Sequence, residues 1–205
     1  MKRYVRSSET LDEVLEIART STDTQELCDI VEENKKDAYD LMLIGESLAK
    51  NLKLPIGFIE HVISTDTWFY NDILYRIVRN PRVNISMLTK MVNSDNYHLR
   101  VAAAKSPYLD LNLMYKLSTD KHQSVNDALV HNTNLPRSLL RDVYDRKKNV
   151  MHSMIFNENT PLEILEAILN DKESDVDTRK AAREAIKRRT GKDLSKNHYH
   201  RSLSY

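Results

Sequence analysis

Cysteine, glycine and proline are scarce in this chain of 205 residues, and each scarcity argues against a class of structure. Cys28 is the single cysteine, so no disulfide can form within the chain, no cysteine-based zinc site is available, and a reducing compartment is expected. Three glycines and five prolines disfavour β-rich folds, which need many turns, and glycine-rich phosphate loops. The expectation that remains is a helical protein without covalent cross-links.

Long apolar runs are also missing. The N-terminal segment MKRYVRSSETLDEVLEIA has basic residues but no apolar core, so we expect no signal peptide. No run approaches the roughly 18 apolar residues that a membrane span requires. We therefore expect a cytoplasmic protein with no membrane partner.

Charge is distributed unevenly along the chain. Residues 179–205 hold nine Lys and Arg against two acidic residues, a balance of +7. Because the whole chain carries +1, residues 1–178 carry −6. A mildly acidic body with a basic end is the pattern that a functional hypothesis has to explain.

What the chain does contain is a recurring segment. Each copy opens with a small polar residue, has an apolar pair seven and eight positions later, and continues to an Asp. The opening residues are Asn51, Asn80, Ser106, Asn132 and Asn157; the last four are 26, 26 and 25 residues apart, and the first gap is 29. The fourth position after each is Pro55, Asn84, Asp110, Pro136 or Pro161, and the Asp residues are Asp66, Asp95, Asp120, Asp145 and Asp171. Self-similarity at a period of this size is typical of solenoid proteins.

Within each segment the apolar spacing of three and four predicts two helices. The pattern around Pro161 predicts a first helix with Thr160 as N-cap, Pro161 as its first residue and Glu163 completing a capping box. Second helices are expected over residues 97–105, 124–131, 149–156 and 175–189. Residues 1–50 are expected to form a cap of about three helices, with the first two pairing as a divergent copy. Residues 51–189 would be the repeat array and 190–205 a basic polar tail, all in a single folded domain.

The motif N-x-x-x-P-x-x-L-L-x-x-L, followed by Asp and then V-R-x-A-x-A, resembles the leucine-rich repeat variant. That family belongs to the α/α superhelical repeats that include HEAT and armadillo proteins. The clearest stretch runs from Asn80 to Ala104, and the resemblance covers residues 51–189. It implies an all-α, right-handed superhelix of about five repeats, an architecture that brings no catalytic residues with it.

The primary functional hypothesis is a non-enzymatic scaffold that binds a protein partner on its concave face, which second helices usually line. A helical wheel places a set of polar and aromatic residues on the exposed faces of these helices. They are Tyr97, His98, Arg100, His122, Asn126, Asp127, His131 and His152. The excess of tyrosine (ten) over phenylalanine (three) fits an interface or ordinary packing equally well.

The alternative hypothesis is a nucleic-acid-binding protein that uses its basic C-terminal end. The phosphate-binding and base-stacking residues would be Arg183, Lys187, Arg188, Arg189, Lys192, Lys196, Tyr199 and Arg201. The structural reading of the same residues is a solvated end whose positive charges complement a helix C-terminus. Replacing Arg188, Arg189 and Lys192 is expected to spare the fold.

A weaker alternative is an enzyme. Trp68 and Asp72 are four residues apart and share a helix face. In this they resemble the α-helical-repeat alkylpurine DNA glycosylases, which pair an aromatic wall with a carboxylate. The acidic body argues against DNA binding, and a packing cluster where the cap joins the array explains the aromatic residues as well.

No metal or cofactor site is expected. The seven histidines are scattered, and only His198 and His200 are closely spaced. The repeated Asp residues could form a ligand-binding row, but we favour a role in capping the turn before each second helix.

Overall fold

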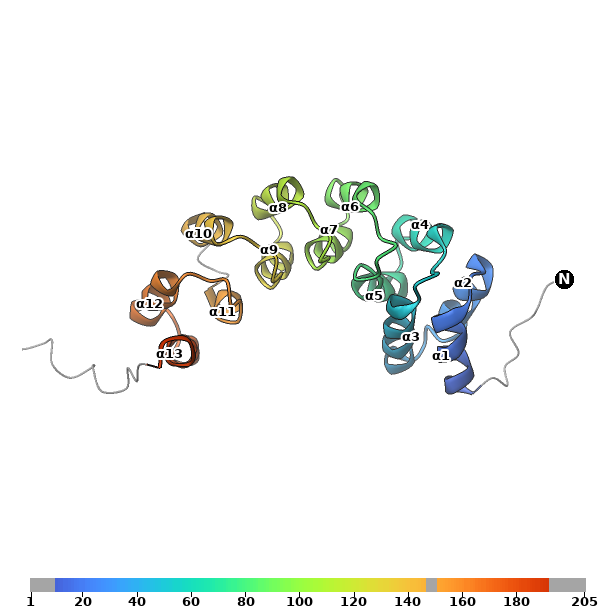
Figure 1. Cartoon of the computed structure of the whole chain (residues 1–205), viewed down its shortest axis with the longest axis horizontal. Coiled ribbons are helices and arrows are strands. Elements are labelled where there is room, and N and C mark those ends of the chain that lie inside the picture. The colour runs from blue at the N-terminus through green and yellow to red at the C-terminus, as the bar shows by residue number, and fades with distance from the viewer. Residues whose placement is uncertain (1–9, 147–150, 192–205) are drawn as a thin grey trace, which may run out of the picture. The chain divides into compact units, whose positions relative to one another are not determined.

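The computed structural model describes residues 10–146 and 151–191. Across these ranges the protein is 69% helical and has no strand, which confirms the all-α expectation (Figure 1). The helices are α1 (Leu11–Thr20), α2 (Thr24–Glu33), α3 (Ala38–Lys50), α4 (Ile56–Ser64), α5 (Trp68–Ile77), α6 (Ile85–Val92), α7 (Tyr97–Ala104), α8 (Leu111–Ser118), α9 (Gln123–Val130), α10 (Arg137–Arg146), α11 (Met151–Ile155), α12 (Leu162–Asn170) and α13 (Val176–Thr190).

The chain divides into two compact units, Met1–Leu129 (unit 1) and Val130–Tyr205 (unit 2). This division does not coincide with the expected boundaries at residues 50 and 189. Each unit has its own buried apolar residues and is described by itself.

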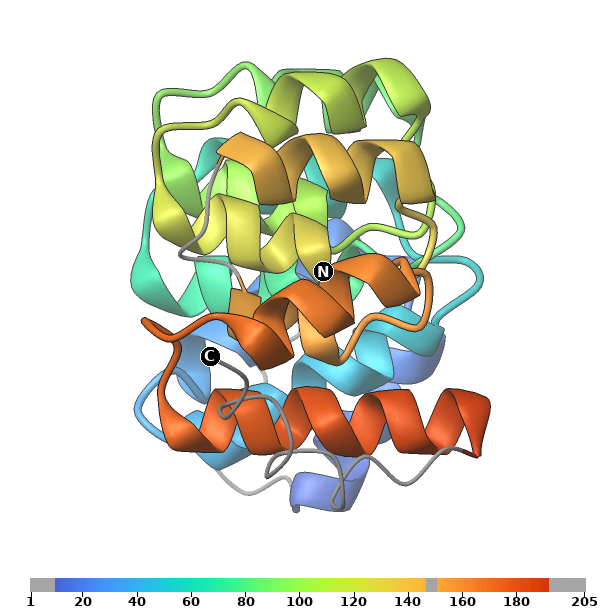
Figure 2. The ribbon, with the colours of Figure 1, turned by 90° about the vertical axis from the view of Figure 1, so that its left-hand side faces the viewer.

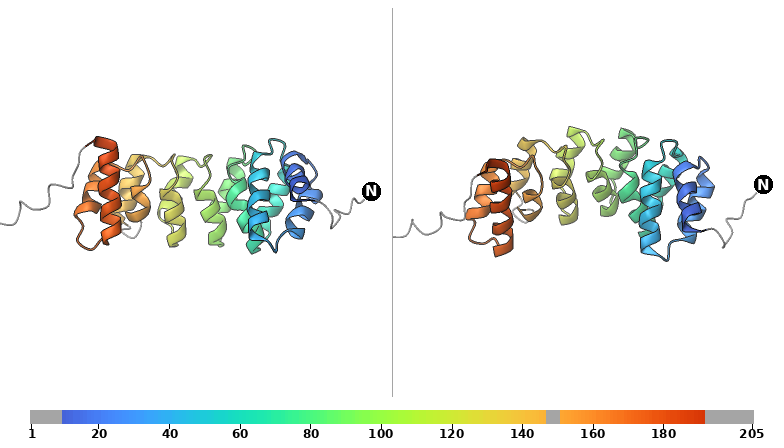
Figure 3. Two further views of the ribbon diagram at one scale, coloured as in Figure 1. Left: turned by 90° about the horizontal axis from the view of Figure 1, so that it is seen from below. Right: turned by 60° about the horizontal axis from the view of Figure 1, so that its bottom comes forward.

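In unit 1 the helices form two rows. Helix α2 packs against α4, α4 against α6, and α6 against α8. The other row joins α1 to α3, α3 to α5, and α5 to α7, so that α5 and α7 lie side by side (Figure 3). Contacts between α4 and α5 and between α6 and α7 connect the rows. The short helices need these neighbours, because two helical turns alone are not stable in water.

The first 50 residues contain the three helices that the sequence predicts. Helix α1 packs in the row of α3, and α2 packs in the row of α4. Helices α1 and α2 also pack against each other.

The small polar residue that opens each segment closes the same local turn every time. Its side-chain oxygen accepts a hydrogen bond from the backbone N–H two residues later. The distances are 2.9 Å at Asn51, 2.9 Å at Asn80, 3.3 Å at Ser106, 3.0 Å at Asn132 and 2.8 Å at Asn157. All five residues are buried. An Asx or Ser turn at a fixed place explains why the sequence repeats this residue type.

The same side chains also bind the preceding segment. Asn51 Nδ2 donates to the carbonyl of Ser21 at 2.8 Å, and Asn80 Nδ2 donates to that of Asn51 at 2.8 Å. Ser106 Oγ donates to the carbonyl of Val78 at 3.0 Å. These bonds join residues 28–30 positions apart in the sequence, so they pair buried backbone carbonyls between consecutive helix pairs.

In unit 2, α12 and α13 pack side by side, and α11 also packs against α13 (Figure 2). Asn157 Nδ2 donates to the carbonyl of Asn132 at 3.1 Å, which repeats the arrangement of unit 1. The carbonyl of Asn157 in turn accepts from Arg189 Nη2 at 2.6 Å, and Arg189 Nη1 donates to the carbonyl of Thr160 at 2.6 Å. Arg189 on α13 therefore donates to the carbonyl of Asn157 as the amides of Asn80 and Asn157 donate to the carbonyls of Asn51 and Asn132.

The predicted capping box before α12 was wrong. Helix α12 begins at Leu162, Pro161 is its N-cap residue, and no side chain caps it. The Thr160 hydroxyl donates instead to the carbonyl of Met154 at 2.7 Å. Thr160 is buried, and its hydroxyl stabilises the turn before α12 rather than the N-terminus of the helix.

Two of the repeated Asp residues close a turn before a second helix, but Asp171 is not the cap of α13, whose N-cap is Asp175. Asp120 Oδ1 accepts from the N–H of His122 at 2.8 Å, and Asp171 Oδ1 accepts from the N–H of Glu173 at 3.0 Å. Before α7 the cap is Asn96 rather than Asp95. Over residues 10–146 and 151–191, no helix is both long enough and apolar enough to cross a bilayer.

Candidate functional site

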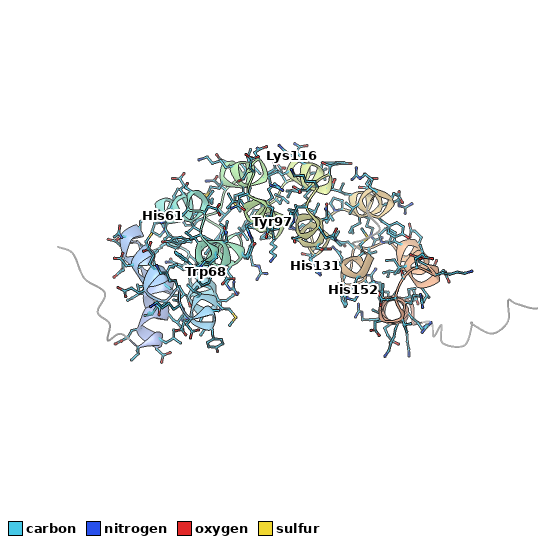
Figure 4. All side chains as sticks on the ribbon, turned by 180° about the vertical axis from the view of Figure 1, so that it is seen from behind. His61, Trp68, Tyr97, Lys116, His131 and His152 are labelled. Atoms are coloured by element: carbon cyan, nitrogen blue, oxygen red, sulfur yellow. The ribbon has the colours of Figure 1, made fainter. Side chains whose placement is uncertain are left out.

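Helices α5 and α7 and the turn before α9 bring aromatic and histidine side chains onto one surface of unit 1. We call this the second-helix surface and define it by Trp68, Tyr75, Tyr97, His98 and His122. Figure 4 shows Trp68 and Tyr97 on the side of unit 1 opposite to Lys116, which is on α8. The helical spacing explains the placement, because Trp68 and Tyr75 are seven residues apart and share a face of α5.

The rings of Tyr75, Tyr97, His98 and His122 are in contact. Tyr97 stacks on His122 with ring centroids 3.8 Å apart at 14°, and lies tilted against His98 at 4.0 Å. The Tyr75 hydroxyl is 2.6 Å from His98 Nδ1. Such contacts hold the side chains in defined orientations, which lowers the entropy lost when a partner binds.

Burial raises the pKa of Tyr75 to about 12, and the nearby Tyr97 and Asp72 contribute further. The phenol is therefore protonated at neutral pH, and its hydroxyl shares a hydrogen bond with His98 Nδ1. On the other side, Lys105 Nζ is 4.5 Å from the centroid of the Tyr75 ring. Desolvation, followed by repulsion from Arg79 and Arg76, lowers the pKa of Lys105.

A pocket of about 670 Å³ opens on this surface within unit 1. We call it the Trp68 pocket. Its walls come from α3, α5, the turn before α5, and the start of α7. The lining residues are Ala38, Met42, Asp66, Trp68, Asn71, Asp72, Tyr75, Arg76, Asn96 and His98.

Two features of the Trp68 pocket are built by close packing. Arg76 crosses α3 at Gly45, where a Cβ would lie 2.5 Å from the Arg76 side chain, so only glycine leaves room for it. Arg76 Nη1 then donates to Asp72 Oδ1 at 3.1 Å, and Arg76 Nε is 3.8 Å from Glu46 Oε1. On the opposite wall, Asn96 Nδ2 donates to Asp66 Oδ1 at 2.8 Å.

Asn71 is the buried polar group of this pocket. Its side chain is 6% exposed, and its Oδ1 has no hydrogen-bond partner among the residues that the structure describes. A buried acceptor without a donor costs about 1–3 kcal/mol.

Among the residues predicted to bind a partner, Tyr97, His98 and His122 come together on the second-helix surface. Asp127 is half-buried and accepts from Gln123 Nε2 at 3.1 Å. His131 and His152 are exposed residues of unit 2.

Arg100 and Asn126 correct the prediction, because both are buried rather than exposed. Arg100 Nε donates to Asp120 at 2.6 Å, and Arg100 Nη1 donates to the carbonyls of Ser94 and Asp95 at 2.8 and 2.9 Å. Asn126 Nδ2 donates to the carbonyl of Asp120 at 3.0 Å. These partners satisfy the donor groups inside the unit, so the two residues stabilise the fold and do not face a ligand.

The predicted nucleic-acid residues separate into three groups. Lys187 and Arg188 are exposed on α13, and Arg183 is half-buried there. Arg189 donates to the two carbonyls described above, and burial lowers its pKa. It therefore holds the turn at Asn157 in place, and its removal should weaken the fold, contrary to the expectation from the sequence. Lys192, Lys196, Tyr199 and Arg201 lie outside the described residues.

Asp66, Asn71, Tyr75, Arg76 and Asn96 are pocket residues that the sequence analysis missed as a group. The available signal was local to α5, where Trp68 and Asp72 were noted at one helical turn; residues 71, 75 and 76 continue the same face. The contribution of Asn96 depends on α7 packing beside α5.

No group of three or more histidine, cysteine or acidic side chains suited to a metal ion occurs in the part of the chain that the structure describes. Comparison with protein-family models, with curated proteins and with solved structures finds no match to the chain.

Proposed function

We propose that this protein is a non-enzymatic interaction scaffold that binds a segment of a protein partner on the second-helix surface of unit 1. The observation that carries the proposal is the gathering of Trp68, Tyr75, Tyr97, His98 and His122 beside a pocket. Tyrosine and tryptophan supply large contact areas at low entropic cost and are enriched where proteins bind each other. Trp68 is 61% exposed, which leaves a large aromatic face for a partner.

The proposal includes the architecture. We propose that the helix pairs belong to an α/α superhelical repeat of the leucine-rich repeat variant or HEAT type. Support comes from the five equivalent turns at Asn51, Asn80, Ser106, Asn132 and Asn157, each closed by the same side-chain bond. A repeat scaffold presents residues from successive helices on one surface, which suits an extended peptide.

Selection of binding peptides from a random library tests this function without knowledge of the native partner. A displayed library of random peptides is selected on the full chain, and the dissociation constants of the recovered peptides are measured against variants. We expect Trp68→Ala and Tyr97→Ala each to weaken binding by roughly ten-fold or more, because truncating an aromatic anchor commonly costs more than 1 kcal/mol.

The matched control is Tyr115→Ala. Tyr115 is a similarly exposed aromatic residue on α8, in the other row of unit 1. The Tyr115→Ala variant should bind the selected peptides with the same affinity as the parent protein. Peptides that lose affinity with Tyr115→Ala but not with Trp68→Ala would place the binding surface on the first helices and contradict the proposal.

The nucleic-acid alternative retains support from Lys187 and Arg188, which are exposed one after the other on α13. A gel-shift titration at several salt concentrations separates it from protein binding, since phosphate contacts give a steep salt dependence. For the glycosylase alternative, Trp68 and Asp72 do line one pocket, but Asp72 is paired with Arg76. Release of a base from alkylated DNA is the direct assay.

A further inference from the structure

The Trp68 pocket offers carboxylate acceptors to a ligand. Asp66, which is exposed, and Asp72, which is half-buried, both line it. A carboxylate can accept several hydrogen bonds through its two oxygens. A ligand that carries several N–H groups therefore suits this pocket better than one that carries acceptors.

The charge of the pocket and of unit 1 also favours a cation. Two carboxylates, Asp66 and Asp72, line the pocket against one cation, Arg76. Residues 10–129 as a whole hold 18 acidic and 13 basic side chains. The lining and the wider unit thus both carry a net negative charge, which attracts a cation to the pocket.

Arg76 and Lys105 have partners of their own within unit 1. Arg76 lies along the wall, where its Nη1 donates both to the carbonyl of Asp72 at 3.0 Å and to the Asp72 carboxylate. Lys105 lies over Tyr75 and covers one face of that ring. Trp68 remains as the exposed aromatic face, with its edge supported by Phe69 at a centroid distance of 5.8 Å.

We propose that the Trp68 pocket binds the guanidinium group of an arginine side chain of the protein partner. This inference rests on the proposed function and names the chemical group that is recognised. A guanidinium is planar, stacks on an indole face, and presents five N–H donors in a fixed fork. That fork can donate to the carboxylates of Asp66 and Asp72, whereas the compact lysine ammonium is strongly hydrated and has no flat face to stack.

Blocked amino acids test the inference on the full chain. Nα-acetyl-arginine N-methylamide is titrated into ¹⁵N-labelled protein, beside the corresponding lysine and citrulline compounds. Trp68 is the only tryptophan of the chain, so its indole N–H gives a single resonance at the pocket. We expect a saturable shift of this resonance with the arginine compound and roughly ten-fold weaker binding of the lysine compound. Citrulline keeps the shape without the charge and should not bind measurably.

Two variants locate the effect. Asp66→Asn and Asp72→Asn each remove one negative charge from the pocket lining, and each should weaken arginine binding. Glu60→Gln removes one carboxylate from an exposed position on α4 and is the matched control, which should bind arginine as the parent does. The circular dichroism spectrum of each variant verifies that the helices are retained.

The inference is overturned if the three compounds shift the Trp68 resonance equally, or if none does. It is also overturned if inorganic phosphate binds at the pocket and arginine does not. Substituting arginine by lysine in the selected peptides separates this result from the proposed function. If the peptides need Trp68 but tolerate that substitution, the scaffold function stands and the arginine assignment fails.

Discussion

Replacing Asn80 by Ala should weaken unit 1 substantially. Asn80 is fully buried, and its Nδ2 donates to the carbonyls of Leu48, Ala49 and Asn51 at 3.1, 3.1 and 2.8 Å. Its Oδ1 accepts from the N–H of Arg82 at 2.9 Å. The amide has two N–H donors shared among the three carbonyls, so with the bond from Arg82 it makes about three full hydrogen bonds, worth about 3 kcal/mol at about 1 kcal/mol each. The carbonyls of Leu48 and Asn51 keep another backbone donor, so we expect the measured loss to be about 2–3 kcal/mol.

The free energy of unfolding is measured by urea titration. Unfolding is monitored by the fluorescence of Trp68, which lies in unit 1. Asn80→Ser should cost less than Asn80→Ala, because the Ser106 hydroxyl meets the same need with a single bond to the carbonyl of Val78. Asn112→Ala is the control, since Asn112 is exposed on α8. A loss for Asn80→Ala below about 1 kcal/mol, or equal to that of the control, would refute the reasoning.

Three further predictions concern other parts of the chain. Leu140→Ala and Leu165→Ala should each lower the free energy of unfolding by roughly 2–4 kcal/mol, because both side chains are fully buried in unit 2. The measurement is a urea titration monitored by circular dichroism, and losses below about half a kcal/mol would contradict the prediction. Since the pKa of Tyr75 is about 12 in the folded protein against an ordinary value of 10.0, its contribution to stability is present below pH 10 and lost as the pH rises toward 12. Urea titrations across that range should therefore show a steeper loss for the parent than for Tyr75→Phe. Removing both Lys187 and Arg188 should leave the melting temperature unchanged and lower the salt slope of any nucleic-acid binding by about 2.

The helices and the opening residue of each segment were accessible from the sequence, because both repeat at a regular spacing. The function of the opening residue was not accessible. Asn80 could be recognised as a turn residue, but its carbonyl partners lie about 30 residues earlier, and only the packing of consecutive helix pairs brings them together.

Arg100 and Asn126 show a second limit. A helical wheel assigned these polar residues to solvent, because polarity alone favours exposure. Their partners are Asp120 and backbone carbonyls of neighbouring turns, and a polar side chain with its partners nearby can be buried at little cost. Sequence spacing does not reveal such partners.

The candidate site was predicted in part. Trp68 and Asp72 were placed on one helix face, and both line the pocket. The sequence did not indicate that Asn71, one residue before Asp72, would be buried without a donor. The contribution of His98 from α7 required the contact between α5 and α7, which a helical pattern does not specify.

The most direct test of the central claim is hydrogen–deuterium exchange of the full chain with and without a selected peptide. The account predicts that the peptide slows exchange in α5 and α7, over residues 68–77 and 97–104, and that it leaves α6 and α8 unchanged. Protection confined to α4, α6 and α8, or to α13, would contradict the proposal that the second-helix surface of unit 1 binds the partner.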